Sequence, residues 1–168
     1  MKAEEILRDL VSFETISQKN NLSMINYILK HYKKFFVQSD LIMGNKNQAN
    51  FYARIGPEAS DGIMFSGHTD VVPVEGQIWK THPFRAELIK NKIYGRGTCD
   101  MKGFIAVVLS LLPRVKVKQL KKPLHLMFSY DEEIGCVGIQ KAVPFLKKMK
   151  YKPRFCVVGE PTEMQLVS

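Results

Sequence analysis

Apolar residues in the first forty positions recur at the three- and four-residue steps of amphipathic helices. One stripe comprises Ile6, Leu7, Leu10 and Val11, and a second comprises Ile25, Ile28, Leu29, Tyr32, Phe35 and Phe36. The polar residues at 17–21 separate the two stripes and predict a turn. The chain is therefore expected to begin with two helices.

From residue 50 onward, short apolar runs alternate with helical patterns. The pattern predicts strands at residues 50–55, 62–67, 123–130 and 154–159, and helices at 101–112 and 137–150. Gly56-Pro57 ends the first of these strands, and Pro113 ends the first of these helices. Residues 74–94 are expected to be irregular and to end in a hairpin. Alternation of this kind predicts a three-layer α/β sandwich with a mixed, largely parallel sheet.

Composition narrows the class of protein only a little. A length of 168 residues, with 45% hydrophobic and 24% charged residues, suits one globular domain with a buried core. No apolar run approaches the roughly 18 residues of a membrane span, and the acidic N-terminal segment does not resemble a secretory signal. Cys99, Cys136 and Cys156 are widely spaced and form no C-x-x-C pair. They indicate reduced thiols in a cytoplasmic protein rather than a set of disulfides. The lack of a long apolar run predicts no membrane partner.

The net charge of +9 raises the hypothesis of nucleic-acid binding. Its main sources are three basic clusters at residues 30–34, 114–122 and 147–154. These clusters fall at expected helix ends and loops, where cations suit the helix dipole and solvent, and no row of aromatic residues alternates with them. A solvated surface is therefore favoured over a nucleic-acid partner, while an anion-attracting role stays open.

Acid-bearing segments mark the ends of several apolar stretches. They are Gly67-His68-Thr69-Asp70, Thr98-Cys99-Asp100-Met101, Tyr130-Asp131-Glu132-Glu133 and Val158-Gly159-Glu160-Pro161. Ligands of open α/β sheets lie at the carboxyl ends of the strands, so the segments that follow predicted strands should meet at one rim. One imidazole and several carboxylates in such a place can bind one or two divalent metal ions.

His68, Asp70 and Asp100 each have an ordinary structural explanation as well. In an extended segment His68 and Asp70 point to the same side, so Asp70 can orient the ring of a metal-bound His68, or it can make a local bond in a turn. Asp100 can bridge two cations near the glycines at 95 and 97, or it can cap the helix that follows.

The glutamates leave similar alternatives open. Glu132 and Glu133 can have separate roles, with one binding metal and the other transferring protons. Alternatively, both can be ordinary solvent-exposed acids after a buried strand. Glu160, which Pro161 holds extended, is either a ligand or an exposed strand end. Convergence of all these groups at one rim favours the metal-site interpretation.

The motifs resemble those of a known enzyme family. GHTDVVP (67–73), GRGTCDMKG (95–103), YDEEIGCVG (130–138) and VVGEPT (157–162) are similar to the motifs of co-catalytic di-zinc aminoacylases and carboxypeptidases. The likeness covers essentially the whole chain, in the right order. It implies a zinc-exopeptidase-like catalytic domain with two divalent metal ions, Zn²⁺ with Co²⁺ as an alternative.

Carried over position by position, the resemblance also implies a set of metal ligands. His68 and Glu160 would bind one metal, Glu133 would bind the other, and Asp100 would bridge both. The peptide bond after Asp100 is often cis in the family.

The resemblance implies further roles and a substrate. Asp70 would orient His68, and Glu132 would be the general base. Trp79, Pro83-Phe84 and residues 120–138 look most like acetylornithine deacetylases, which implies hydrolysis of N2-acetyl-L-ornithine to L-ornithine and acetate in arginine biosynthesis. Succinyl-diaminopimelate desuccinylase or dipeptidase activity remains an alternative, as does a non-catalytic metal-binding remnant.

Members of this family also have a histidine on the second metal and a lid domain, both further along the chain. His31, His82 and His125 do not match that histidine and are expected to be surface or structural residues. We therefore expect residues 1–168 to be the N-terminal part of the catalytic domain, truncated before the lid, with impaired activity. The longer protein would be a homodimer, because the lid contributes dimer contacts in the family, and would act on a small N-acyl amino acid.

Overall fold

The structure, a computed structural model, describes residues 1–44 and 47–167. Its strands are β1 (Gln38–Met43), β2 (Ala49–Ile55), β3 (Gly62–His68), β4 (Glu87–Ile89), β5 (Lys92–Tyr94), β6 (Leu124–Ser129) and β7 (Pro153–Val158). Its α-helices are α1 (Ala3–Ser12), α2 (Leu22–Tyr32), α3 (Lys102–Leu111) and α4 (Val137–Lys148). Short 3-10 segments are η1 (Lys33–Phe35), η2 (Leu112–Arg114) and η3 (Val117–Gln119).

Five strands form one mixed sheet in the order β1-β2-β6-β3-β7. β2 pairs antiparallel with β1 and with β6, whereas β3 pairs parallel with β6 and with β7. All of these strands except β2 therefore run in the same direction, which confirms the mixed, largely parallel sheet. This arrangement places the carboxyl ends of β3, β6 and β7 side by side.

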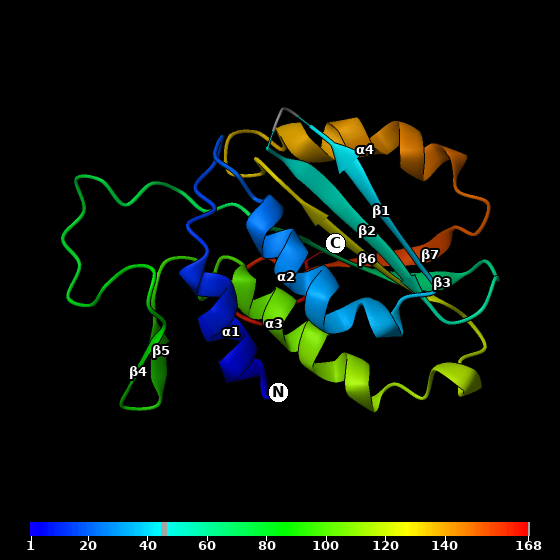
Figure 1. Ribbon diagram of the computed structural model, residues 1–168, viewed down its shortest axis with the longest axis horizontal. Coiled ribbons are helices and arrows are strands. Elements are labelled where there is room, and N and C mark those ends of the chain that lie inside the picture. Colours follow the sequence, from blue (N-terminus) through cyan, green and yellow to red (C-terminus); the bar gives the residue numbers. More distant parts are fainter. Residues whose placement is uncertain (45–46, 168) are drawn as a thin grey trace.

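Helices cover both faces of the sheet, which makes three layers (Figure 1). The apolar stripes of α1, α2 and α3 pack on one face, around Phe51 and Phe128. α4 packs on the other face, where Ala142 joins Tyr52 and Met127. Successive strand residues point to opposite faces, so β2 and β6 contribute neighbouring residues to two different cores. The three-layer α/β sandwich predicted from the sequence is confirmed.

β1 is the strand that the sequence pattern did not predict. Its residues are all exposed or partly buried, and polar residues, among them Ser39 and Asp40, leave it only a three-residue apolar run at 41–43. It lies at the edge of the sheet and is a strand because it pairs with β2. The predicted hairpin is present as β4 and β5, which form a separate ladder beside the main body (Figure 1).

Among the described residues, no helix combines the length and the apolar character needed to cross a lipid bilayer.

His125 and Tyr52 form a buried polar pair in the sheet. The Tyr52 hydroxyl lies 2.8 Å from Nδ1 of His125, and the histidine is fully buried. Burial, and then the positive charge of Arg54, lower the pKa of His125 to about 4. The imidazole is therefore neutral near pH 7, and its Nδ1 shares one hydrogen bond with the Tyr52 hydroxyl, in which the tautomer decides which group donates.

Acidification is expected to destabilise the fold through His125. In the unfolded chain this residue binds a proton near pH 6.5, but in the folded chain only near pH 4. Its contribution to the free energy of unfolding is therefore complete above pH 6.5 and is lost as the pH falls toward 4. The loss amounts to at most roughly 3 kcal/mol.

Thermal unfolding at pH 7.5, 6 and 5 measures this effect. His125→Asn keeps an oxygen that can accept from Tyr52, and its stability should depend less on pH over this range than that of the wild type. His31→Asn, a change on the exposed surface of α2, is the matched control and should keep the wild-type dependence. Equal pH dependence in His125→Asn and the wild type would contradict the prediction.

Candidate metal site

The carboxyl ends of β3, β6 and β7 bring the predicted site residues together. His68 is the last residue of β3 and lies beside the end of β6. Glu132 and Glu133 follow in the turn after β6, and Glu160 comes just after β7. Asp100 arrives from the loop that precedes α3. Parallel strands thus collect residues from four separate motifs at one end of the sheet.

The buried ring of His68 directs Nε2 toward the acids. Nδ1 donates to the backbone carbonyl oxygen of Asp70 at 2.9 Å. Nε2 lies 3.0 Å from Oδ1 of Asp100, 3.8 Å from Oε2 of Glu132 and 3.9 Å from Oε1 of Glu160. Because the bond at Nδ1 fixes the ring, Nε2 is the nitrogen that can bind a cation.

Asp70 supports the site in more ways than the sequence indicated. Its backbone oxygen, rather than its carboxylate, is the nearer partner of His68, and its Oδ1 lies 3.5 Å from Nδ1. The carboxylate accepts hydrogen bonds from the Ser17 hydroxyl at 2.7 Å and from the amides of Glu132 at 3.0 Å and Glu133 at 3.3 Å. One buried carboxylate therefore lies against the imidazole and holds the backbone of two other site residues.

The turn after β6 determines the backbone positions of Glu132 and Glu133. Asp131 and Cys136 have φ angles of 50° and 56°, in the left-handed region, and Gly135 has a φ of 103°. The amides of Gly135 and Cys136 both donate to the Glu132 carbonyl, at 2.9 and 2.8 Å. These bonds close a tight turn, from which the two neighbouring acids project.

The loop before α3 presents Asp100 to His68. Gly97 has a φ of 82°, which glycine adopts without steric cost, and the peptide bond between Asp100 and Met101 is cis. Met101, not Asp100, occupies the capping position of α3. The Asp100 side chain contacts the imidazole instead, so the helix-cap explanation does not hold.

Burial and crowding shift the pKa values of the site residues. Burial raises the pKa of Glu133, and the charge of Asp100 adds to this. Burial also raises the pKa of Glu160, against the attraction of His68. Burial would lower the pKa of His68, but Asp70 and Asp100 raise it to about 9. Burial would raise the pKa of Asp70, but its hydrogen bonds with His68, the Glu132 amide and Ser17 hold it below its usual value.

The donor atoms form two overlapping groups that share His68. One contains His68, Glu132 and Glu160, and the other contains His68, Asp100 and Glu133. Within each group the donor atoms all lie within 4.8 Å of one another. Imidazole nitrogen and carboxylate oxygen are normal zinc ligands, and a divalent cation would relieve the repulsion among these acids. The residues present therefore fit a divalent metal centre.

Ser17, Cys136 and Lys102 were not singled out from the sequence as site residues, and the first two contact site carboxylates. Ser17 bonds to Asp70, as described above. The Sγ of Cys136 donates to Oε1 of Glu132 at 3.2 Å. Lys102 is fully buried, and its Nζ donates to a backbone carbonyl at the end of α1 at 2.7 Å. Of these residues, only Lys102 could have been noticed in the sequence, because it is a single lysine at the start of an apolar helical run.

Residues 64–167 match the protein family described as peptidase family M20/M25/M40. This range covers well over half of the chain, so the protein belongs to that family of metal-dependent peptidases.

Curated relatives point to a narrower group. The acetylornithine deacetylase of Buchnera aphidicola subsp. Schizaphis graminum is 35% identical over 170 residues, which cover 97% of this chain and 44% of the relative. The acetylornithine deacetylase of Salmonella typhimurium is 36% identical over 169 residues, which cover 96% of this chain and 43% of the relative. The chain thus spans less than half the length of these relatives.

Solved structures share the fold. The M20 family metallo-carboxypeptidase Sso-CP2 from Sulfolobus solfataricus matches with a TM-score of 0.77 and 26% identity, over 95% of this chain and 37% of that one. Human carnosine dipeptidase 1 matches with a TM-score of 0.75 and 19% identity, over 93% of this chain and 37% of that one. The second likeness concerns the fold alone.

Asp70→Asn is expected to loosen the site and to destabilise the protein. An amide nitrogen cannot accept from the donors that face Asp70, so the free energy of unfolding should fall by roughly 2–4 kcal/mol. Chemical denaturation measures the loss, and hydrogen exchange should show faster exchange of the Glu132 and Glu133 amides. Asp40→Asn, on the edge strand β1, should change neither. Wild-type exchange at both amides in Asp70→Asn would contradict the role given to Asp70.

Proposed function

We propose that this chain carries the metal-binding half of an amidohydrolase that removes the acetyl group from N2-acetyl-L-ornithine, yielding L-ornithine and acetate. The observation that carries this proposal is the convergence of His68 with four acids at the carboxyl ends of parallel strands. The identity of 35–36% to acetylornithine deacetylases supports the choice of substrate. The free thiols of all three cysteines support a reducing, cytoplasmic location, as expected for an enzyme of arginine biosynthesis.

Zinc is the proposed metal, with cobalt as an alternative. His68 and Glu160 would bind one ion, Glu133 a second, and Asp100 both. When bound, such ions polarise an amide carbonyl and make an attacking water more acidic.

Glu132 is proposed as the group that moves protons. Its Oε2 lies 3.8 Å from Nε2 of His68, at the edge of the donor cluster. Its backbone is held by Asp70, and its other oxygen accepts from Cys136. A carboxylate held in this way can take a proton from the attacking water and deliver it to the departing amine. Asp70 would keep the ring of His68 in position throughout.

Glu132→Gln is expected to separate catalysis from metal binding. An amide cannot accept the proton of water, so in the longer protein expected from the resemblance, hydrolysis of N2-acetyl-L-ornithine should fall by about 10²–10⁴-fold, while the amount of bound zinc stays the same. Ornithine release, followed by mass spectrometry, and elemental analysis give the two readouts. Glu4→Gln, on the exposed side of α1, is the control and should leave both unchanged. Wild-type turnover in Glu132→Gln would contradict its role as the base.

The purified 168-residue chain is expected to bind about one zinc ion through His68, Asp100 and Glu160, and to hydrolyse the substrate only weakly. The reason is that, under the family resemblance, a histidine of the second metal and the lid lie further along the protein. His68→Ala should lose the zinc, and His31→Ala should keep it. Absence of zinc after reconstitution of the wild-type chain would count against the metal site, and rapid hydrolysis by this chain would count against the division of ligands.

A further inference from the structure

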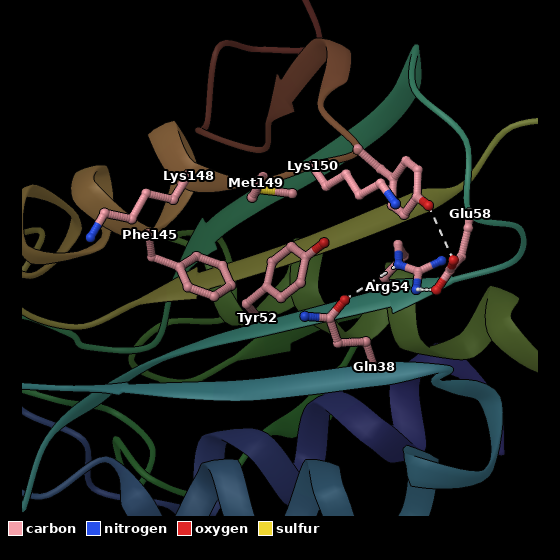
Figure 2. Close-up of a pocket in the computed structure, with 9 residues that line it drawn as sticks. Gln38, Tyr52, Arg54, Glu58, Phe145, Lys148, Met149 and Lys150 are labelled. Atoms are coloured by element: carbon pink, nitrogen blue, oxygen red, sulfur yellow. Dashed lines mark hydrogen bonds and ion pairs between the residues drawn. The ribbon is translucent and has the colours of Figure 1, made fainter.

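A pocket lies at the opposite end of the sheet from the metal site. In the pairing of β2 with β6, Arg54 lies opposite His125, near the start of β6, whereas His68 lies beside the end of β6. The pocket has a volume of about 260 Å³. It is lined by Gln38, Tyr52, Arg54, Glu58, Phe145, Lys148, Met149, Lys150 and Tyr151 (Figure 2).

One wall of this pocket is apolar and aromatic. The rings of Tyr52 and Phe145 meet edge to face, with centroids 5.0 Å apart, and Met149 packs in the same cluster. Tyr52 is held in place because its hydroxyl is bonded to the buried His125. Tyr52 itself is 1% exposed, so the surface that this wall offers to an apolar group comes from the partly buried Phe145 and Met149.

The remaining wall and the rim are cationic. The side chain of Arg54 is only 7% exposed, and it donates to the carbonyls of Gly56 at 3.3 Å and Pro57 at 3.0 Å. Lys148 and Lys150 lie on the rim and are exposed. Arg54 and Lys150 lie on the same side of the pocket as the Glu58 carboxylate, whereas the amino group of Lys148 points away from it (Figure 2). With one acidic and three basic residues, the lining carries an excess of two positive charges.

The carboxylate of Glu58 forms an ion pair with Arg54 and so shows where a carboxylate can bind. Its Oε1 lies 3.4 Å from the guanidinium, and its Oε2 accepts from the Tyr151 hydroxyl at 3.1 Å (Figure 2). The side chain of Glu58 is 68% exposed, and an ion pair of this kind contributes little to stability. An external carboxylate can therefore replace Glu58 at small cost while Arg54 stays held by the two carbonyls.

We propose that this pocket binds a small organic anion with a carboxylate on an apolar or aromatic body. The carboxylate takes the place of Glu58 at Arg54, with Lys150 nearby and Lys148 adding attraction from further away, and the body packs on Phe145 and Met149. The site is separate from the metal site and does not depend on the proposed hydrolase activity. It gives a local function to part of the basic cluster at residues 147–154.

Three probes of the same shape test the charge requirement. Phenylacetate, neutral phenylacetamide and cationic phenethylamine are each titrated into the full chain, and backbone amide shifts are followed by NMR. Phenylacetate should shift the signals of residues 145–151 and of Arg54, and phenylacetamide should bind about tenfold more weakly or worse. Equal binding of all three probes, or shifts elsewhere only, would overturn the proposal.

Substitutions that preserve the fold locate the site. Glu58→Gln removes the internal competitor and should tighten phenylacetate binding about two- to fivefold. The double change Lys148→Gln with Lys150→Gln should weaken it by a similar or larger factor. Lys90→Gln with Lys92→Gln, in the β4–β5 hairpin, is the matched control and should have no effect. Weaker binding in Glu58→Gln, or unchanged binding without Lys148 and Lys150, would refute this mode of binding.

Discussion

The carboxylate of Asp70 is buried where three segments of the chain meet. It accepts from Ser17, which precedes α2, and from the amides of Glu132 and Glu133, which follow β6. A buried carboxylate is costly unless charges and donors compensate for the lost water. The arrangement that satisfies Asp70 therefore also sets the distances between His68 and the two neighbouring glutamates, so the stability of this end of the sheet and the geometry of the metal site have the same origin.

The two ends of the sheet carry opposite charge. At the carboxyl ends of β3, β6 and β7, four acids and one imidazole crowd together, and burial raises the pKa of Glu133 and Glu160. At the other end, the Arg54 guanidinium and two lysines line a pocket with one carboxylate. The first end is suited to cations and the second to anions. The net charge of +9 hides this division, because a sum over the chain carries no information on position.

Segments whose local pattern agrees with their final environment were predictable. β2 is buried along its whole length and appears in the sequence as a nearly apolar run, and α1 shows its buried stripe directly. β1 could not be predicted in this way, because an edge strand with half-exposed residues has no distinctive pattern and depends on its pairing with β2. Cys136 is similar, since its contact with Glu132 depends on a tight turn with a left-handed residue at that position.

The motifs around His68, Asp100, Glu132, Glu133 and Glu160 were enough to name the family and the residue types of a metal site, because chemistry restricts which side chains bind cations. The motifs did not determine which atoms these side chains contact in the folded protein. Whether Asp100 capped a helix or faced His68 depended on the path of its loop, and the partner of the His68 Nδ1 depended on the local backbone. Such choices involve hydrogen bonds between residues up to 63 positions apart, as between Asp70 and Glu133. Only the packed sheet brings these groups within bonding distance.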